Sequence, residues 1–341
     1  MNKTPDVVKA APLSEQTVIT DFFEPLTQGD KSALGLLDDA ALIDIPDNHE
    51  LVVTKDILVA GTHFFADDPP ADIGHKALAV NLSDLAAKGA APRCYLLALA
   101  LDKTCGEAWL RAFASGLGAL QRVHGCRLIG GDTVVTGGPL AISITAFGLV
   151  PRGTMVKRGG AQPGDPIYVT GTVGDAALGL KIRSQIPDYS KWELEDSAVQ
   201  YLVSRYLRPQ PRLALIPYLR QYATASIDIS DGLLGDFQKL CSVSGVGGTI
   251  EESRIPFSEP ARKCLDRDPG LFDTLVSGGD DYEILFAVNA DARDAFEKDV
   301  AGLDFPVAFV GLIAKEGEDC GIAGADGHIR AFDHVSYDHF G

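Results

Sequence analysis

Basic residues are scarce in this chain of 341 residues: 30 Lys and Arg stand against 47 Asp and Glu, giving a formal net charge of −17. Nucleic-acid backbones and anionic membranes are bound mainly through clusters of Lys and Arg. We therefore expect neither nucleic acid nor a membrane as a partner. An anionic substrate would need positive charge from another source, and a divalent cation is the first source to consider.

Cysteine is also sparse, with six residues and no C-x-x-C pair. This content excludes a disulfide scaffold and predicts free thiols in a reducing compartment. The N-terminus lacks the apolar core of a secretory signal, and the longest apolar runs, at 94–101 and 140–150, are too short to span a bilayer. We expect a cytoplasmic protein.

The common nucleotide and hydrolase motifs are missing. The chain has no Gly-Lys dipeptide and hence no P-loop, and it has no G-x-G-x-x-G fingerprint. H-E-x-x-H, G-x-S-x-G and the kinase motifs H-R-D and D-F-G are missing too. Any nucleotide chemistry must therefore use a different kind of site.

Apolar periodicity predicts two α+β domains, because strands and helices do not alternate regularly enough for a doubly wound sheet. Val18, Phe22, Phe23 and Leu26 predict an amphipathic helix within residues 1–33. The N-terminal half is expected to hold strands at 40–45, 51–59, 94–101 and 140–150 and helices at 71–88 and 106–124. The C-terminal half is expected to hold strands at 167–170, 225–229, 282–288 and 307–312 and helices at 176–182, 197–207, 212–222 and 233–243.

A domain boundary is expected at 151–166, which is dense in Gly, Pro and basic residues. The domains would then span 1–150 and 151–341.

Aspartate recurs in loops beside Gly or Ser, where apolar segments begin or end. The segments are GLLDDAAL (35–42), VVTKDILVAGTHFF (52–65), KALAVNLSDLAAKGA (76–90), LIGGDTVV (128–135), IDISDGLLGD (227–236) and SGGDDYEILF (277–286). Mg²⁺ prefers a few carboxylates together with water and substrate phosphates, so these aspartates, if brought together, would form a Mg–nucleotide site. In the helix 71–88, Asn81, Asp84 and Lys88 share one face.

Each segment taken singly has a simpler interpretation. Asp132 after two glycines and Asp231 before Gly232 are typical of turns or caps. A single His63 is typical of a packed or solvated histidine. The residues alone indicate a two-domain protein with a metal–carboxylate site.

Taken in order, KALAVNLSDLAAKGA, LIGGDT, VTGTVGDAALGL, DISDGLLGD and SGGDDYEI resemble the thiamine-monophosphate kinases, a branch of the aminoimidazole-ribonucleotide-synthetase-like ATP-binding superfamily. The resemblance runs from about Gly35 to residues 337–340. It implies ATP-dependent phosphorylation of thiamine monophosphate to thiamine diphosphate by direct in-line transfer, with several Mg²⁺ ions. It also implies a homodimer. The four-stranded sheet of each N-terminal α+β domain would pair with its twin into a β-barrel, and a mixed α+β C-terminal domain would complete the site.

The resemblance also implies roles for individual residues. The Mg²⁺ ligands would be Asp39, Thr54, Asp56, Asp84, Asp132, Asp228 and Asp231. The nucleotide contacts would be Gly131, Arg158 and Ser230. The thiamine-phosphate contacts would be His63, Asp280 and a stacking residue near the C-terminus, either His334 or Tyr337. No general base is assigned, because the attacking phosphate oxygen is already largely ionised near neutral pH.

Three positions depart from the family pattern. Leu37 stands where relatives often have Gly, Lys55 where they commonly have Thr, and Asp280 where Glu is common. Lys55 would either replace a cation, pair with Asp56 or point to solvent. We expect fewer metal ions around Asp56 as a result.

Two alternative functions stay open. One is another ATP-dependent enzyme of the superfamily, such as aminoimidazole ribonucleotide synthetase, selenophosphate synthetase or a hydrogenase-maturation protein. The other is a non-catalytic regulator that binds nucleotide or metal and has lost turnover through Leu37 and Lys55.

Overall fold

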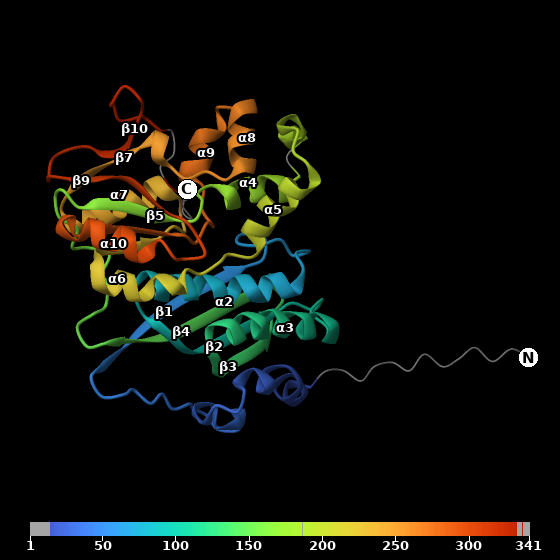
Figure 1. The fold of residues 1–341 in the computed structure, drawn as a ribbon. Helices are drawn as coiled ribbons and strands as arrows, with labels where there is room; N and C mark the ends of the chain where they lie inside the picture. The colour runs from blue at the N-terminus through green and yellow to red at the C-terminus, as the bar shows by residue number, and fades with distance from the viewer. Residues whose placement is uncertain (1–13, 186, 333–335, 337–341) are drawn as a thin grey trace, which may run out of the picture.

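Strand β4 (Ala141–Pro151) shows how the N-terminal half is built, because every second residue from Ile142 to Val150 is buried. Successive side chains of a strand point to opposite faces, so one face of its sheet is buried and the other is not. The computed structural model describes residues 14–185, 187–332 and 336. Within it the first sheet has four strands in the order β1-β4-β2-β3 (Figure 1). The other three strands are β1 (His49–Val59), β2 (Ala91–Leu101) and β3 (Arg127–Val135).

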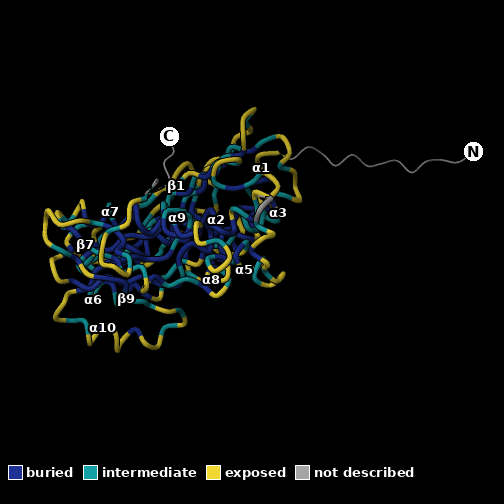
Figure 2. The backbone as a smooth tube through the Cα atoms, turned by 90° about the horizontal axis from the view of Figure 1, so that it is seen from above, coloured by how far each residue is buried: buried dark blue, intermediate teal, exposed yellow. Residues whose placement is uncertain are grey.

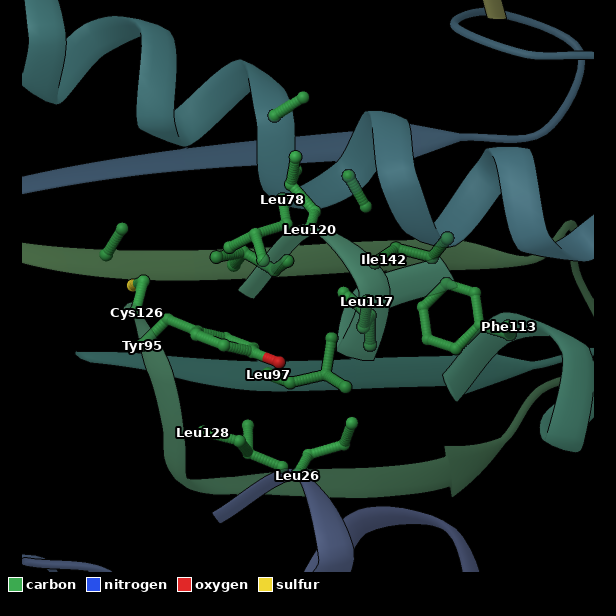
Figure 3. Close-up of a cluster of buried hydrophobic side chains, with 14 of the residues drawn as sticks. Leu26, Leu78, Tyr95, Leu97, Phe113, Leu117, Leu120, Cys126, Leu128 and Ile142 are labelled. Carbon is green, nitrogen blue, oxygen red and sulfur yellow. The ribbon is translucent and has the colours of Figure 1, made fainter. Parts of the chain in front are cut away.

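Helices α2 (Pro70–Ala87) and α3 (Glu107–His124) cover the buried face of this sheet. Figure 3 shows side chains of both helices packed against Ile142, Tyr95 and Leu97 of the strands. Leu26, from the N-terminal segment, joins the same cluster. The expected helices at 71–88 and 106–124 are confirmed to within a residue. The N-terminal sheet has four strands, as implied, but one of them is β3, which was not predicted, in place of the strand expected at 40–45.

The C-terminal half contains a six-stranded mixed sheet in the order β10-β7-β9-β5-β8-β6. Its strands are β5 (Pro166–Thr170), β6 (Ala223–Asp228), β7 (Gly247–Glu251), β8 (Ile284–Val288), β9 (Val307–Ala314) and β10 (Cys320–Ala323). Its helices are α4 (Asp175–Arg183), α5 (Asp196–Leu207), α6 (Ile216–Tyr222), α7 (Leu233–Ser244), α8 (Glu259–Arg267), α9 (Leu271–Ser277) and α10 (Arg293–Val300). The β10–β7 pair is parallel and the other pairs are antiparallel, so the predicted α+β class is confirmed.

Several local expectations were wrong. Residues 40–46 have no regular structure, and Leu42 in this apolar run is 68% exposed rather than part of a strand. The predicted helix at 212–222 begins as a 3₁₀ turn, Leu213–Leu215, before α6. The N-terminal helix consists of three short pieces, α1 (Glu15–Val18), a π-helical turn (Ile19–Phe23) and a 3₁₀ turn (Glu24–Thr27). All six cysteines are free thiols, as expected. None of the helices described here is long and apolar enough to cross a membrane.

Helix α2 lies between the two halves of the molecule (Figure 1). It contacts β1, β4 and α3 on one side and β6, α5 and α6 on the other. Most of its side chains are buried, and the buried backbone runs through the middle of the molecule, where α2 lies (Figure 2). The polar residues of α2 must therefore find partners inside the protein.

Three polar side chains of α2 reach the C-terminal half. The Lys76 ammonium lies 3.1 Å from Asp280 Oδ2, and the Ser83 hydroxyl donates to the Tyr282 carbonyl over 3.4 Å. The Lys88 ammonium donates to the Ser226 carbonyl over 2.6 Å. These bonds tie the two halves together along one helix.

Two glycines let α2 and α3 approach closely. A Cβ atom on Gly74 would lie 2.4 Å from the Phe113 carbonyl oxygen. A Cβ atom on Gly116 would lie 1.9 Å from the Ala71 carbonyl oxygen. Both atoms are backbone oxygens and cannot rotate away as a side chain could. Any residue larger than glycine would therefore push the helices apart.

We expect Gly116→Ala to lower the free energy of unfolding by about 2 kcal/mol, because overpacking displaces a buried helix pair. Urea denaturation of the purified protein measures the change. Gly137→Ala is the matched control, since nothing lies within 4 Å of the added Cβ there. Equal stability of the two variants would contradict this account of the helix contact.

Candidate active site

Three predicted metal ligands meet beside α2, and each comes from a different element. Asp56 lies on β1, Asp84 on α2 and Asp228 at the end of β6. Thr54, two residues before Asp56 and on the same face of β1, donates its hydroxyl hydrogen to Asp84 Oδ2. Strand pairing and helix packing thus bring together residues that are far apart in the sequence.

The electrostatics of these carboxylates show how closely they are grouped. Burial, together with the charge of Asp84, raises the pKa of Asp56 to about 7. Burial and the charges of Asp84 and Asp236 raise the pKa of Asp228 well above its ordinary value, although Lys88 opposes the shift. Negative charge at this site is therefore only partly compensated by the protein.

The donor set suits Mg²⁺, which prefers hard oxygen ligands. Among the described residues, no group of three or more His, Cys, Asp or Glu side chains is placed so that it could hold a metal ion by itself. Mg²⁺ is usually held by one or two carboxylates together with water and substrate phosphates. Thr54, Asp56, Asp84 and Asp228 therefore fit an open magnesium site that a phosphate-bearing substrate would complete.

Two cations border the carboxylates. Burial lowers the pKa of Lys88 to about 8, Asp228 and Asp84 counteract the shift, and Arg158 adds to it. Arg158, predicted to contact nucleotide, is thus placed near the cluster. Lys88 received no role from the sequence, although its helical spacing from Asp84 was a usable signal.

The loop after β6 is held by a carboxylate that the sequence analysis missed. Asp236 Oδ2 accepts hydrogen bonds from the backbone N–H groups of Ser230, over 3.0 Å, and Asp231, over 2.9 Å. The Lys239 ammonium lies 2.6 Å from Asp231 Oδ2 and 2.9 Å from Asp236 Oδ1. The predicted ligand Asp231 is therefore already ion-paired, and metal binding there would require an exchange of partners.

In segment 280–283, just before β8, alternate residues lie on opposite sides of the backbone. Asp280 and Tyr282 both adopt left-handed backbone angles, with φ of 72° and 50°. Asp281 accepts hydrogen bonds from the backbone N–H groups of Gly174, over 2.7 Å, and Ala176, over 3.3 Å, at the start of α4. Left-handed angles are strained for residues other than glycine and cluster at functional sites.

Tyr282 is a second residue that sequence reasoning missed. Burial, followed by the charges of Asp280, Asp56, Asp228 and Asp84, raises the pKa of its phenol well above its ordinary value. The neutral ring therefore lies among all four carboxylates. The GGDDYE motif contained it, but only the fold shows which way the side chain points.

The two predicted thiamine-phosphate contacts in the described residues lie close together. His63 Nδ1 accepts a hydrogen bond from the Val59 backbone N–H over 3.0 Å. The His63 carbonyl accepts one from the Lys76 ammonium over 3.1 Å, and the same ammonium pairs with Asp280. His334 and Tyr337 lie outside the described residues.

A separate set of predicted residues lies on the other face of the N-terminal sheet. Asp39, Gly131 and Asp132 line a cavity of about 850 Å³, together with Lys55. The Lys55 ammonium donates to Ser143 Oγ over 2.8 Å and to Thr145 Oγ1 over 3.4 Å. Lys55 therefore interacts with β4 and not with Asp56, because neighbouring residues of a strand face opposite ways.

Comparison with known proteins places these residues in a family context. The AIR synthase related protein N-terminal domain matches residues 37–150, and the corresponding C-terminal domain matches residues 162–322. Thiamine-monophosphate kinase of Salmonella typhimurium is 42% identical over 306 residues, which cover 90% of this chain and 91% of that protein. The same enzyme of Caulobacter vibrioides is 39% identical over 321 residues, which cover 93% and 89%.

Solved structures are similar over the same length. Thiamine-monophosphate kinase from Stenotrophomonas maltophilia K279a has a TM-score of 0.81 at 40% identity, covering 92% of this chain and 97% of that one. AaThiL complexed with AMPPCP and TMP has a TM-score of 0.73 at 28% identity, covering 95% and 97%. The hydrogenase maturation protein HypE of E. coli, at 24% identity and a TM-score of 0.75, shares the fold alone.

We expect Asp56→Asn to stabilise the metal-free protein at about pH 8 and to have a smaller effect at about pH 5. The folded protein titrates Asp56 near pH 7 against an ordinary value of 3.8, so it binds the proton more tightly than the unfolded chain does. Wild-type stability therefore falls as the pH rises between those values, and the gain from Asn grows by about 2 kcal/mol.

Urea denaturation in EDTA at the two pH values measures this gain. Asp47→Asn, at an exposed turn before β1, is the control and should behave like the wild type at both. A gain from Asp56→Asn that does not change with pH would refute the shifted titration.

Proposed function

This chain belongs to the thiamine-monophosphate kinase family, and we propose that it phosphorylates thiamine monophosphate to thiamine diphosphate with ATP and Mg²⁺ by direct in-line transfer. The observation that carries the proposal is the meeting of Asp56, Asp84 and Asp228 beside the Lys76–Asp280 pair, at the junction of the two halves. One part of this junction suits a metal-bound polyphosphate, and the adjacent part holds the predicted substrate contacts.

Two phosphorylated substrates repel each other, so phosphoryl transfer depends on charge neutralisation and positioning. Mg²⁺, when bound, would supply positive charge at the phosphates. Thr54, Asp56, Asp84 and Asp228 would hold it, and Arg158 together with the loop at Ser230 and Asp231 would orient the nucleotide. His63 and Asp280 would orient thiamine monophosphate. No general base is proposed, because the acceptor is a phosphate oxygen.

We infer that this chain forms the homodimer that the family resemblance implies. The dimer would explain why Asp39, Gly131 and Asp132 lie away from the other predicted site residues. The uncovered face of the N-terminal sheet carries exposed apolar side chains, including Val53 (54% exposed) and Ile57 (57% exposed). A twin sheet packed on this face would bury them and form the expected β-barrel. Residues 1–150 would then be the ATP- and Mg²⁺-binding and dimerisation domain, and residues 151–341 would complete the nucleotide and substrate site.

The dimer would also bring Asp39, Gly131 and Asp132 to a nucleotide. Asp132 lies on edge strand β3 and Asp56 on the opposite edge strand β1, with β4 and β2 between them. Three strand spacings amount to about 14 Å, and the two side chains face opposite ways. We therefore propose that Asp39, Gly131 and Asp132 serve the site of the partner subunit. The six unpaired thiols support a reducing, cytoplasmic location.

We expect the purified protein to convert ATP and thiamine monophosphate to ADP and thiamine diphosphate, with turnover lost on chelation of Mg²⁺. Asp84→Asn should lower kcat by about a hundredfold or more, because it removes charge at the phosphates, and should not lower the melting temperature. Chromatographic detection of both products measures turnover, and Asp47→Asn is the control. A wild-type protein that binds ATP without making thiamine diphosphate would instead be a regulator.

We expect Asp84→Asn and Asp132→Asn, each inactive alone, to restore activity when co-expressed in one dimer. If Asp132 acts across the interface, one of the two sites of each mixed dimer keeps both aspartates, and the isolated mixed dimer has about half of wild-type activity. Mixed dimers isolated with two affinity tags allow the measurement. Co-expression of Asp84→Asn with Asp56→Asn, on the same face of one subunit, should restore nothing. No recovery in the first pair would place Asp132 in its own subunit's site.

A further inference from the structure

The Lys76 ammonium is buried at the junction of the two halves, with 3% of its side chain exposed. It lies 3.1 Å from Asp280 Oδ2, donates to the His63 carbonyl over 3.1 Å and lies 3.9 Å from the centre of the Tyr206 ring. Tyr206 donates its own hydroxyl hydrogen to the His63 carbonyl over 3.3 Å. One cation therefore joins segments from β1–α2, α5 and the loop before β8.

A buried ammonium is costly unless it is fully paired, and Lys76 has a carboxylate, a carbonyl and an aromatic face as partners. Its pairing with Asp280 spans 204 positions of the sequence. The Asp280 side chain is 27% exposed, so its carboxylate is accessible to solvent while its Oδ2 atom is paired with the buried Lys76 ammonium. The site thus contains an immobilised carboxylate that is still accessible to a ligand.

Lys76 is not needed merely to dock the two halves. Lys88 bonds to the Ser226 carbonyl, the Arg208 guanidinium lies 2.8 Å from Asp72 Oδ1, and the His75 ring lies 2.8 Å from the Pro209 carbonyl. These contacts tie α2 to the C-terminal half at other points along the helix. Lys76 alone among them contacts both predicted substrate residues.

We propose that Lys76 is the positioning residue of the thiamine-phosphate end of the site. It fixes the direction of the Asp280 carboxylate and, through the His63 carbonyl, the loop that carries His63. Its positive charge also offsets one of the carboxylates that surround Tyr282, and its contact with Oδ2 holds the Asp280 carboxylate in a fixed direction toward the substrate. This inference rests on the proposed function, because it assigns Lys76 to the acceptor and not to the nucleotide.

The test compares Lys76→Met with the wild type. Met keeps the length and apolar stem of Lys and removes only the ammonium. We expect KM for thiamine monophosphate to rise about ten- to hundredfold, with a smaller change in kcat and with ATP binding within about twofold of wild type. Calorimetric titration with thiamine monophosphate should show the same loss without turnover.

A double-mutant cycle shows whether Lys76 acts through Asp280. The double variant Lys76→Met/Asp280→Asn should bind thiamine monophosphate no worse than Asp280→Asn alone. Additive losses would overturn the positioning role, and so would an unchanged KM in Lys76→Met.

Two controls separate this role from a loss of stability. Val310→Ala, in the core of the C-terminal sheet, should lower the melting temperature and leave KM unchanged. Lys263→Met repeats the substitution at an exposed position of α8 and should change neither. A wild-type protein without turnover would overturn the proposed function. A working wild type with an unaffected Lys76→Met variant would overturn this inference alone.

Discussion

The burial of α2 on nearly all sides is the constraint on which the rest of the structure depends. A helix in this position has little contact with solvent, so most of its polar residues are satisfied by the N-terminal sheet or the C-terminal half, although the buried Asn81 Oδ1 has no hydrogen-bond partner among the described residues. Lys76, Ser83 and Lys88 all find their partners in the C-terminal half. The glycine contacts with α3 fix the helix from the other side. The relative placement of the two halves thus depends in large part on this helix, with further ion pairs such as Arg183–Asp68 beside it.

The same constraint brings the candidate active site together. Asp84 lies on α2 between Ser83 and Lys88, so docking the helix brings its carboxylate against Asp56 and Asp228. Like charges in a buried place destabilise the empty protein. A bound cation would reverse that effect, so the energy that disfavours the empty state would favour the loaded one. The acidic composition of the chain would then serve to bind phosphates.

The sequence predicted those features of the fold and of the site that depend on residues close together in the chain. The ends of α2 and α3 followed from apolar spacing and a following glycine, and the cluster of Asp56, Asp84 and Asp228 followed from the ordered motifs. The strand expected at 40–45 failed because an apolar run needs a neighbouring strand to pair with. The motifs also could not show that Asp132 and Asp56 face opposite sides of one sheet. That separation depends on the order of the strands in the sheet, which cannot be read from a short segment of sequence.

Two of the residues that the sequence did not reveal, Lys76 and Tyr282, have roles that depend on partners far away in the sequence. Lys76 and Asp280 stand in separate motifs, and neither motif alone indicates an ion pair. Within the GGDDYE segment, Asp281 binds the start of α4, and Glu283 is held by Arg205 over 2.7 Å and by Arg212 over 2.6 Å. Tyr282 lies between these two buried anchors and Asp280 directly precedes the first, so the anchors hold the backbone next to both left-handed positions. The left-handed angles at Asp280 and Tyr282, on the side of the proposed substrate site, are therefore maintained by the buried hydrogen bonds of Asp281 and Glu283 on the side of the core.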